Sequence, residues 1–448
     1  MNVSLIIGVF FVVSVCTTLA QFWDVEGDFC KTRRPESCCR NRDDACTVPI
    51  FGTLCYCDQF CNRTSADCCP DFWPVCLGEP RPQPIVRDKC FHEGKSYQSG
   101  HSYQVNCNKC TCKQKTPTVY EFVCEQNVCL VRPELIKEVN SGNYGWRASN
   151  YSFFWGKTLE EGIRYRLGTF KPTRPTMAMH EINIKMKDRL PEHFDARQHW
   201  PGLIHDIRDQ GECGASWAFS TTALASDRLA IQSMGREKIS LSPQQLISCQ
   251  NRAQKGCHGG HLDRAWWYLK KRGVVSEECY PYKSGFTKDE GLCSVRKARG
   301  RHGHIGCPNG REESVRQSTP PYRVGPREEE IMQEIYNNGP VQATFKVRDD
   351  FFLYSNGVYR HTKLSEHLPE AYRQHGWHSI RIIGWGVDRS GGSPVKYWLC
   401  ANSWGRRWGE DGYFRILRGN DECEIEMFII GVWAKRNMND NEESNIIT

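Results

Sequence analysis

The sequence predicts an α+β domain that is preceded by small disulfide-rich modules. Two observations support this prediction. Cysteine is concentrated in the first third of the 448-residue chain, whereas the region after about residue 131 has few cysteines, long helical and strand patterns and most of the tryptophans. At about 150 residues per domain, the length allows roughly three domains. The later region must therefore contain the main hydrophobic core.

The overall composition excludes two classes of protein. Apolar residues make up 39% and charged residues 25%, and the mean hydropathy is −0.59, which fits a soluble globular chain and neither a polytopic membrane enzyme nor a disordered chain. The 59 Lys and Arg exceed the 52 Asp and Glu by 7, and this mild excess does not by itself indicate a nucleic-acid partner. We expect no nucleic acid, no cofactor and no metal.

The N-terminus carries a candidate secretory signal. Residues 5–15 form an apolar run, and Thr18 and Ala20 are small residues of the kind that a signal peptidase reads, so we predict a signal peptide over residues 1–20. A buried N-terminal strand is the alternative, because a positive n-region is missing apart from the amino group. The run is too short to span a bilayer, and no later stretch approaches about 20 apolar residues. A secreted chain without a membrane span follows.

Cleavage after Ala20 would affect how the cysteines of the mature chain are interpreted. It removes Cys16 and leaves 24 of the 25 cysteines, an even number in an oxidising compartment, which favours disulfides over metal sites. Two Asn-x-Ser/Thr sequons of the chain that remains begin at Asn62 and Asn150, and both become candidate glycosylation sites.

The segment over residues 30–78 is the densest in cysteine. It cannot bury enough apolar area to fold unaided, so we expect cross-links worth about 2–4 kcal/mol each. The spacing from Cys39 to Cys76 resembles a somatomedin-B module, which usually has eight cysteines. Cys30 and Cys38 exceed that number and could supply an additional bridge, although spacing alone does not give the pairing. Its ten cysteines are residues 30, 38, 39, 46, 55, 57, 61, 68, 69 and 76.

A Pro-rich stretch over residues 79–89 predicts a semi-rigid linker. The six cysteines that follow, within residues 90–130, look like a short von Willebrand factor C-type module. Its Cys107 and Cys110 have the C-x-x-C spacing of a zinc site, an alternative that an exported protein disfavours. Both small modules are typical protein-binding surfaces, and a role as mere spacers is the alternative.

The segment over residues 209–220 indicates the chemistry of the large domain. Trp217, Leu224 and Ile231 recur at seven-residue steps, which predicts a helix with one apolar stripe that begins at Ser216. The Ser216 side chain would lie at the positive end of the helix dipole. Far downstream, His378 and Asn402 lie in two β-rich runs. A nucleophile position on a helix N-terminus, followed by His and then Asn, is the papain-like order.

From Trp146 to about Trp433 the chain resembles a cathepsin B-type papain-fold peptidase. The Gly-Cys-x-Gly-Gly motif at residues 256–260 and the start of a mature domain at Leu190 carry this resemblance. It implies a papain-like fold of two lobes over residues 190–435, preceded by a propeptide-like segment over residues 131–189.

The resemblance also implies a role for individual residues. Gln210 falls on the oxyanion-hole glutamine and Ser216 on the catalytic cysteine, and His378 and Asn402 are the two other catalytic positions. The remaining matches are the cleft residues Gly259, Gly260 and Trp404 and the disulfide cysteines Cys213, Cys257, Cys249 and Cys293, of which Cys213 bridges to Cys257.

Serine at position 216 weakens the case for catalysis. A helix N-terminus and an imidazolium can lower a cysteine pKa to about 3–4, whereas a serine needs neutral His378 as a base, oriented by a carboxylate. The third position is Asn402, and in serine proteases the Asp to Asn exchange costs about 10⁴ in kcat, or about 5–6 kcal/mol. We predict a protein without peptidase activity. A weak serine-type peptidase is the alternative.

The stretch over residues 279–321 corresponds to the cathepsin B occluding loop. His302 and His304 are not adjacent, so the exopeptidase role of the family's loop histidines is not carried over. The loop offers a basic run instead, which predicts binding of sulfated glycans such as heparan sulfate. A solvated flexible loop, or cleavage after one of its arginines, is the alternative. The basic residues are Arg296, Lys297, Arg299 and Arg301.

The combination of modules resembles the tubulointerstitial nephritis antigen family and covers nearly the whole mature chain. The resemblance implies a secreted, glycosylated protein of the extracellular matrix or basement membrane, without proteolysis. Its partners would be laminin- or collagen-type proteins, cell-surface receptors or secreted signalling proteins. A peptide-capturing decoy is a further alternative. Removal of the propeptide-like segment and pairing of Cys400 with Cys423 stay open, and residues 436–448 are predicted to be disordered.

Overall fold

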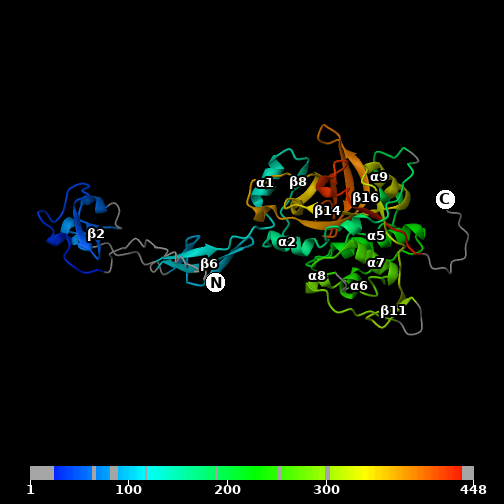
Figure 1. Cartoon of the computed structure of the whole chain (residues 1–448), viewed down its shortest axis with the longest axis horizontal. Coiled ribbons are helices and arrows are strands. Elements are labelled where there is room, and N and C mark those ends of the chain that lie inside the picture. Colours follow the sequence, from blue (N-terminus) through cyan, green and yellow to red (C-terminus); the bar gives the residue numbers. More distant parts are fainter. Residues whose placement is uncertain are drawn as a thin grey trace, which may run out of the picture. The chain divides into compact units, whose positions relative to one another are not determined.

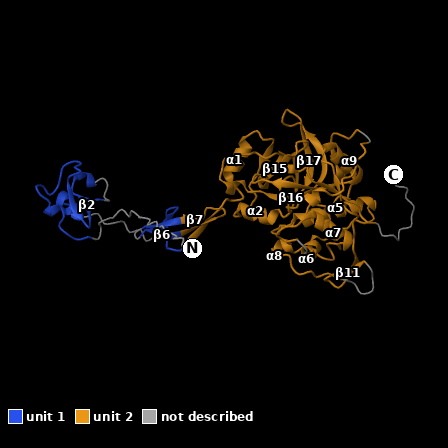
Figure 2. Cartoon of the chain, viewed as in Figure 1, with its two compact units in different colours: residues 1–101, 112–122 blue, residues 102–111, 123–448 orange. Residues whose placement is uncertain are grey.

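The computed structural model describes residues 25–62, 67–80, 89–116, 119–186, 189–250, 254–297 and 303–435. The predicted signal peptide, most of the linker, Arg299, Arg301 and the predicted disordered tail lie outside these ranges. No helix within them is long and apolar enough to cross a membrane. The chain divides into two compact units, residues 1–101 with 112–122, and residues 102–111 with 123–448 (Figure 2).

The first cysteine-rich module is a small disulfide-linked body. Its strands β1 (Thr47–Ile50) and β2 (Thr53–Tyr56) form a hairpin, and η1 (Cys30–Thr32), η2 (Gln59–Asn62) and η3 (Trp73–Leu77) are its short helices. Buried cysteines, Phe72 and Trp73 make up most of its core. The disulfides are Cys30–Cys57, Cys38–Cys76, Cys39–Cys46, Cys55–Cys69 and Cys61–Cys68.

The prediction that Cys30 and Cys38 form an additional bridge with each other is therefore wrong. Each of them pairs with one of the module's other eight cysteines. The carboxylate of Asp71 accepts hydrogen bonds from the backbone N–H groups of Phe29, Cys30 and Lys31 at 2.9–3.0 Å. These bonds fix Cys30 beside the module core, where it meets Cys57.

The second module consists of short strands. These are β3 (Cys90–His92), β4 (Lys95–Tyr97), β5 (Ser102–Val105), β6 (Asn108–Thr116) and β7 (Val119–Cys124). Its disulfides are Cys90–Cys112, Cys107–Cys129 and Cys110–Cys124. Because Cys107 and Cys110 are both oxidised and bonded to other cysteines, their C-x-x-C pair does not form a zinc site.

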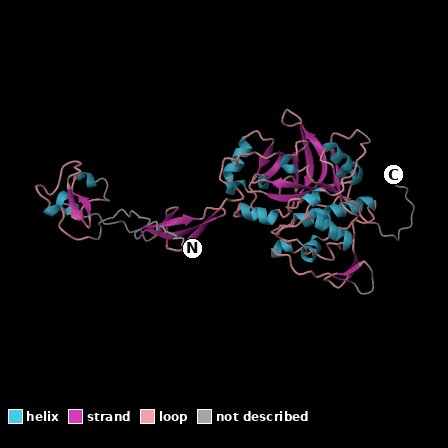
Figure 3. Cartoon of the chain, viewed as in Figure 1, coloured by secondary structure: helices cyan, strands magenta, loops and turns pink. Residues whose placement is uncertain are grey.

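The large domain has a mainly helical half and a half built around a β-sheet, which α1 (Pro133–Ser141) and α9 (Glu328–Asn338) flank in Figures 1 and 3. One half contains α5 (Ser216–Gln232), α6 (Pro243–Cys249), α7 (Leu262–Lys271) and α8 (Ser284–Thr287). The other half is a sheet in the order β13-β19-β14-β16-β17-β18-β15-β8, with β9 paired to β16. Each half has its own buried apolar cluster. The sheet strands are β13 (Tyr322–Val324), β14 (Val341–Val347), β15 (Tyr354–Tyr359), β16 (Gly376–Asp388), β17 (Val395–Ala401), β18 (Tyr413–Leu417), β19 (Ile429–Gly431) and β9 (Phe194–Asp195).

Smaller elements complete the domain. Three short strands of the loop over residues 279–321 form a separate sheet in the order β10-β11-β12. The remaining elements are α4 (Ala196–His199), β10 (Arg296–Lys297), β11 (His304–Gly306), β12 (Glu312–Ser314), α9 (Glu328–Asn338), η4 (Phe351–Leu353), η5 (Glu370–Arg373) and η6 (Glu422–Glu424).

Helix α5 begins at Ser216, as predicted, but it has more than one apolar stripe. Fourteen of its 17 residues are buried, including Asp227 and Arg228. These two charges are paired with Arg381 and Glu334 respectively, which lie outside the helix. The helix is buried nearly all round, and its two buried charges are paired with residues of the surrounding elements.

The propeptide-like segment is packed into the large domain. It contains α1 (Pro133–Ser141), β8 (Trp146–Ala148), α2 (Leu159–Arg166) and α3 (Arg174–Met177), and β8 pairs with β15 at the edge of the sheet. Thr158 and Glu161 form a capping box that starts α2. Leu135 and Trp146 belong to the same buried cluster as the sheet.

Candidate active-site cleft

Two hydrogen-bond donors converge on one backbone oxygen at the start of α5. The N–H of Ser216 and the side-chain Nε2 of Gln210 donate to the carbonyl oxygen of Leu167, at 3.3 Å and 3.0 Å. Ser216 and Gln210 are fully buried. A backbone N–H and a side-chain amide that point at one oxygen are the geometry of an oxyanion hole. The occupant here is a carbonyl of the chain's own propeptide-like segment.

The residues next to Leu167 continue along the cleft. On one wall, Gly260 donates to the Gly168 carbonyl and accepts from the Phe170 N–H, both at 2.9 Å. On the other wall, the indole of Trp404 donates to the Arg166 carbonyl at 2.6 Å. Residues 166–170 thus use the hydrogen-bonding groups on both sides of the cleft.

Two glycines allow this close approach. Gly168 has a φ of +115°, and a Cβ at this position would lie 2.0 Å from the Gly214 carbonyl oxygen. At Gly259, a Cβ would lie 2.5 Å from the ring of Phe170. All three cleft residues named from the sequence, Gly259, Gly260 and Trp404, therefore contact the propeptide-like segment.

His378 and Asn402 form a buried pair behind this segment. His378 lies on β16, and its Nε2 donates to Asn402 Oδ1 at 2.7 Å, which also accepts from the Ser403 N–H. This bond assigns the proton to Nε2. Nδ1 of His378 then carries a lone pair, and it has no hydrogen-bond partner among the described residues. Burial lowers the His378 pKa to about 4, so the ring is neutral near pH 7.

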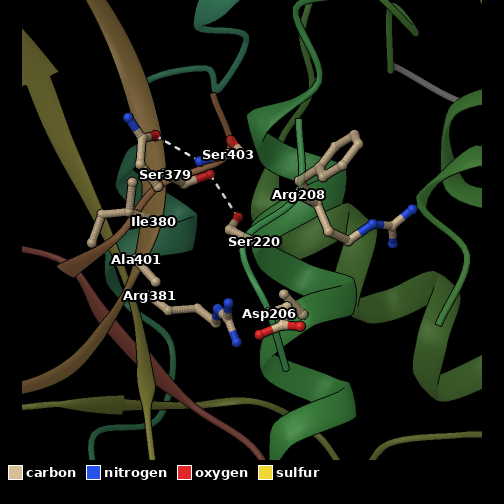
Figure 4. Close-up of a pocket in the computed structure, with 11 residues that line it drawn as sticks. Asp206, Arg208, Ser220, Ser379, Ile380, Arg381, Ala401 and Ser403 are labelled. Atoms are coloured by element: carbon tan, nitrogen blue, oxygen red, sulfur yellow. Dashed lines mark hydrogen bonds between the residues drawn. The ribbon is translucent and has the colours of Figure 1, made fainter. Parts of the chain in front are cut away.

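A chain of hydroxyl groups directs the Ser216 proton away from His378. Ser216 Oγ is 2.8 Å from Thr169 Oγ1, which is 2.7 Å from Ser379 Oγ, and this atom is 2.8 Å from Ser220 Oγ. Figure 4 shows the contact between Ser220 and Ser379 beside a cavity of about 20 Å³. Ser220 donates its hydrogen to the Ser216 carbonyl at 2.7 Å and accepts from Gln342.

Because each hydroxyl has one hydrogen, the order of donation follows from this last bond. Ser379 must donate to Ser220, Thr169 to Ser379, and Ser216 to Thr169. The Ser216 proton is therefore held by a residue of the propeptide-like segment, and Nδ1 of His378 does not receive it.

Comparison with known proteins places the chain in a family. A model of the papain family of cysteine proteases matches residues 190–432. The tubulointerstitial nephritis antigen-like protein of Homo sapiens is 49% identical over 430 residues, which cover 93% of this chain and 90% of that one. The human tubulointerstitial nephritis antigen is 46% identical, with 93% and 89% covered. The chain belongs to the tubulointerstitial nephritis antigen family of papain-like proteins.

Solved structures show the same fold. ProCathepsin B S9 from Trypanosoma congolense is 29% identical, covers 68% of this chain and is itself covered to 99%, with a TM-score of 0.57. The predicted papain-like, cathepsin B-type fold with preceding small modules is thus confirmed for this family member.

The structure places the other predicted site residues as follows. It joins Cys213 to Cys257 and Cys249 to Cys293, whereas Cys400 and Cys423 are both free thiols. Asn150 is exposed, and Arg296 is exposed on β10. The side chains of Asn62, Lys297, Arg299 and Arg301 lie outside the described part of the chain. The glycan-binding loop stays a prediction.

The buried His378 of this family member should make stability depend on pH. Its pKa is about 4 in the folded chain and about 6.5 when unfolded, so the unfolded chain binds more protons between these values. The free energy of unfolding should fall by about 2–3 kcal/mol from pH 7 to pH 4.5 through this residue. Urea unfolding of the wild type and of His378→Gln at both pH values measures the difference. Equal pH slopes in the two proteins would contradict the assignment.

Proposed function

We propose that this chain is a secreted, non-catalytic papain-fold glycoprotein that acts as a binding adaptor in the extracellular matrix. The main support is the Leu167 carbonyl, which lies between the donors of Ser216 and Gln210 where a substrate carbonyl would bind. Ser216 stands at the position of the catalytic cysteine, and Gln210, His378 and Asn402 are vestiges of the site.

The chemistry of the cleft favours this reading over a weak peptidase. A serine nucleophile must give its proton to the histidine, but the Ser216 proton goes to Thr169. Asn402 offers an amide in place of the carboxylate that would stabilise a charged imidazole, a change that costs serine proteases about 10⁴ in kcat. Attack on a peptide would require that residues 166–170 leave the cleft first.

An adaptor whose cleft is filled must bind through its outer surfaces. The two disulfide-linked modules and the basic run that begins at Arg296 are the surfaces we assign to binding. The proposed partners are laminin- or collagen-class matrix proteins, cell-surface receptors or secreted signalling proteins, and heparan sulfate. Quantitative co-purification of the chain with matrix proteins from conditioned medium tests this part. If the Ser216→Ala variant recovers the same amount of matrix protein as the wild type, the adaptor is supported. If the recovery of partners depends on Ser216, the peptide-capturing decoy is supported.

Peptide turnover tests the absence of catalysis. We expect the purified chain and its Ser216→Ala variant to give the same background rate on a broad peptide library, because the hydroxyl is not activated and its carbonyl site is occupied. An active cathepsin B-type peptidase in the same assay shows that the library contains cleavable sequences. Turnover by the wild type that disappears in Ser216→Ala would establish the peptidase alternative.

A further inference from the structure

Helix α7 carries a tryptophan on its outer side. Its apolar side belongs to the buried cluster of the helical half, beside α5 in Figure 1, and consists of Leu262, Ala265, Trp266 and Leu269. The next residue, Trp267, is 51% exposed. Within the described part of the chain, its indole has no hydrogen bond and no ring contact. A single exposed tryptophan is not by itself a binding site, so its neighbours decide what it can do.

Three cations surround this indole. Residues three and four positions apart on a helix are neighbours, with Cβ atoms about 5–6 Å apart. Arg264 precedes Trp267 by three positions, and Lys270 and Lys271 follow it by three and four. Arg264 and Lys271 are exposed, and Lys270 is partly buried. None of the three cations forms an ion pair with a described residue, and Asp263 is the one acidic residue of the helix.

Helix stability accounts for only part of this arrangement. Lys270 and Lys271 lie in the last turn, where a cation interacts favourably with the negative end of the helix dipole. Arg264 is the third residue of the helix, where the positive end of the same dipole opposes a cation. Neither the dipole nor a carboxylate among the described residues offsets its charge. Other exposed arginines of the domain are paired with carboxylates, among them Arg197, Arg389 and Arg406.

The chemistry of this face fits a sulfated sugar chain. Cations attract the sulfate groups, and binding a polyanion releases its counterions. The face of an aromatic ring carries partial negative charge, which attracts the C–H groups of a sugar ring stacked on it. Arg264 and Lys271 are seven residues apart, which is about 10 Å along a helix, so an extended chain can contact both with Trp267 between them. A lipid surface fits less well, because the other large apolar residues of α7 face the core.

We propose that the outer face of α7 binds a sulfated glycosaminoglycan through Arg264, Trp267, Lys270 and Lys271. This inference rests on the proposed function, which includes heparan sulfate among the partners. It adds a second glycan-binding surface, on a different element from the basic run that begins at Arg296. It also assigns a stacking contact, which a run of basic residues does not provide.

Heparin binding by the full chain tests the charges of this face. Arg264→Gln/Lys271→Gln should weaken binding of a heparin oligosaccharide at least about tenfold. It should also reduce the slope of log affinity against log salt by about one for each sulfate contact that is lost. Lys137→Gln/Lys363→Gln is the matched control, because it removes the same charge from two exposed lysines, on α1 and in the loop after β15. Its affinity and salt slope should equal those of the wild type.

Trp267→Ala separates stacking from charge. It removes the ring and leaves all the cations, so the heparin affinity should fall at least about fivefold while the salt slope stays the same. Trp267→Phe keeps an aromatic ring and should recover part of this loss. Because Trp267 is exposed, both variants should fold, and circular dichroism checks this.

Four outcomes overturn the proposal. Heparin binding that is unchanged in the α7 variants does so, and its loss in Arg296→Gln would then place the glycan on the basic run and leave the proposed function intact. An equal loss in the Lys137→Gln/Lys363→Gln control would show that only net charge matters. Polyglutamate or desulfated heparin that binds as tightly as heparin would show that the face does not select sulfate groups. A wild type that does not bind heparin would remove heparan sulfate from the proposed function as well, whereas the co-purification with matrix proteins tests the other partners separately.

Discussion

Replacing Gly168 with alanine should drive residues 166–170 out of the cleft. The new Cβ would lie 2.0 Å from the carbonyl oxygen and 2.1 Å from the carbonyl carbon of Gly214. These are backbone atoms, so no side chain can rotate away to relieve the clash. The φ of +115° adds strain, because an L side chain rarely adopts it. We expect the clash and the backbone strain together to destabilise the docked position of residues 166–170 by about 3 kcal/mol or more.

Hydrogen exchange followed by mass spectrometry measures this displacement. In Gly168→Ala, peptides that contain residues 162–170 and the Ser216 amide should exchange faster, because the Leu167 carbonyl no longer accepts from Ser216. Gly156→Ala is the matched control in the same segment. Its φ is +82°, but the nearest atom to a Cβ is Asn106 O at 3.9 Å, so it has the backbone strain without the clash. Exchange that is equally fast in the two variants would contradict a specific role for Gly168.

The secondary structure around the predicted site residues could be predicted from the sequence. The seven-residue recurrence of Trp217, Leu224 and Ile231 places the start of α5 at Ser216, and the β-rich runs place His378 and Asn402 on or beside strands. Such patterns depend only on the local sequence, and they indicate which residues of a single helix or strand are buried. The same pattern did not show that α5 is buried nearly all round, because the residues that satisfy Asp227 and Arg228 lie far away in the chain.

The contacts that close the cleft could not be predicted in this way. The group that lies between Ser216 and Gln210 is a backbone carbonyl, which every residue type has, so Leu167 gives no signal of its own. Thr169 and Ser379 are 210 residues apart, and nothing in their neighbours marks them as partners. Gly168 was the one available hint, since a glycine often marks a close approach of two backbones. The disulfide partners of Cys30 and Cys38 could not be predicted for the same reason, because the spacing of cysteines along the chain does not show which of them are close in space.

Replacing Arg132 with alanine should cost the large domain about 3–5 kcal/mol. Arg132 lies immediately before α1, and its guanidinium pairs with Asp349 and donates to Ser365 at 3.0 Å. The side chains of the ion pair are only 7% and 4% exposed. Without Arg132, the buried Asp349 would lie beside Asp350 with its charge uncompensated. Denaturant unfolding at pH 7.5 measures the loss.

The exposed Arg406 is the matched control for Arg132. It pairs with Asp206 and Asp411 but is 53% exposed, so Arg406→Ala should cost at most about 1 kcal/mol. The deficit of Arg132→Ala should also shrink at pH 5, because burial and Asp350 raise the Asp349 pKa and protonation removes the unpaired charge. Equal costs for the two arginines, or a deficit that does not change with pH, would show that Asp349 does not need its partner.

The double variant Arg132→Ala/Gly168→Ala shows whether residues 131–189 dock as one unit. Arg132 holds the beginning of the segment, and Gly168 lets its middle enter the cleft. If the segment leaves as a whole in either single variant, the second change removes contacts that are already lost, and the double variant should cost less than the sum. Additive costs would mean that the two anchors act independently, and that the cleft can open while α1 stays in place.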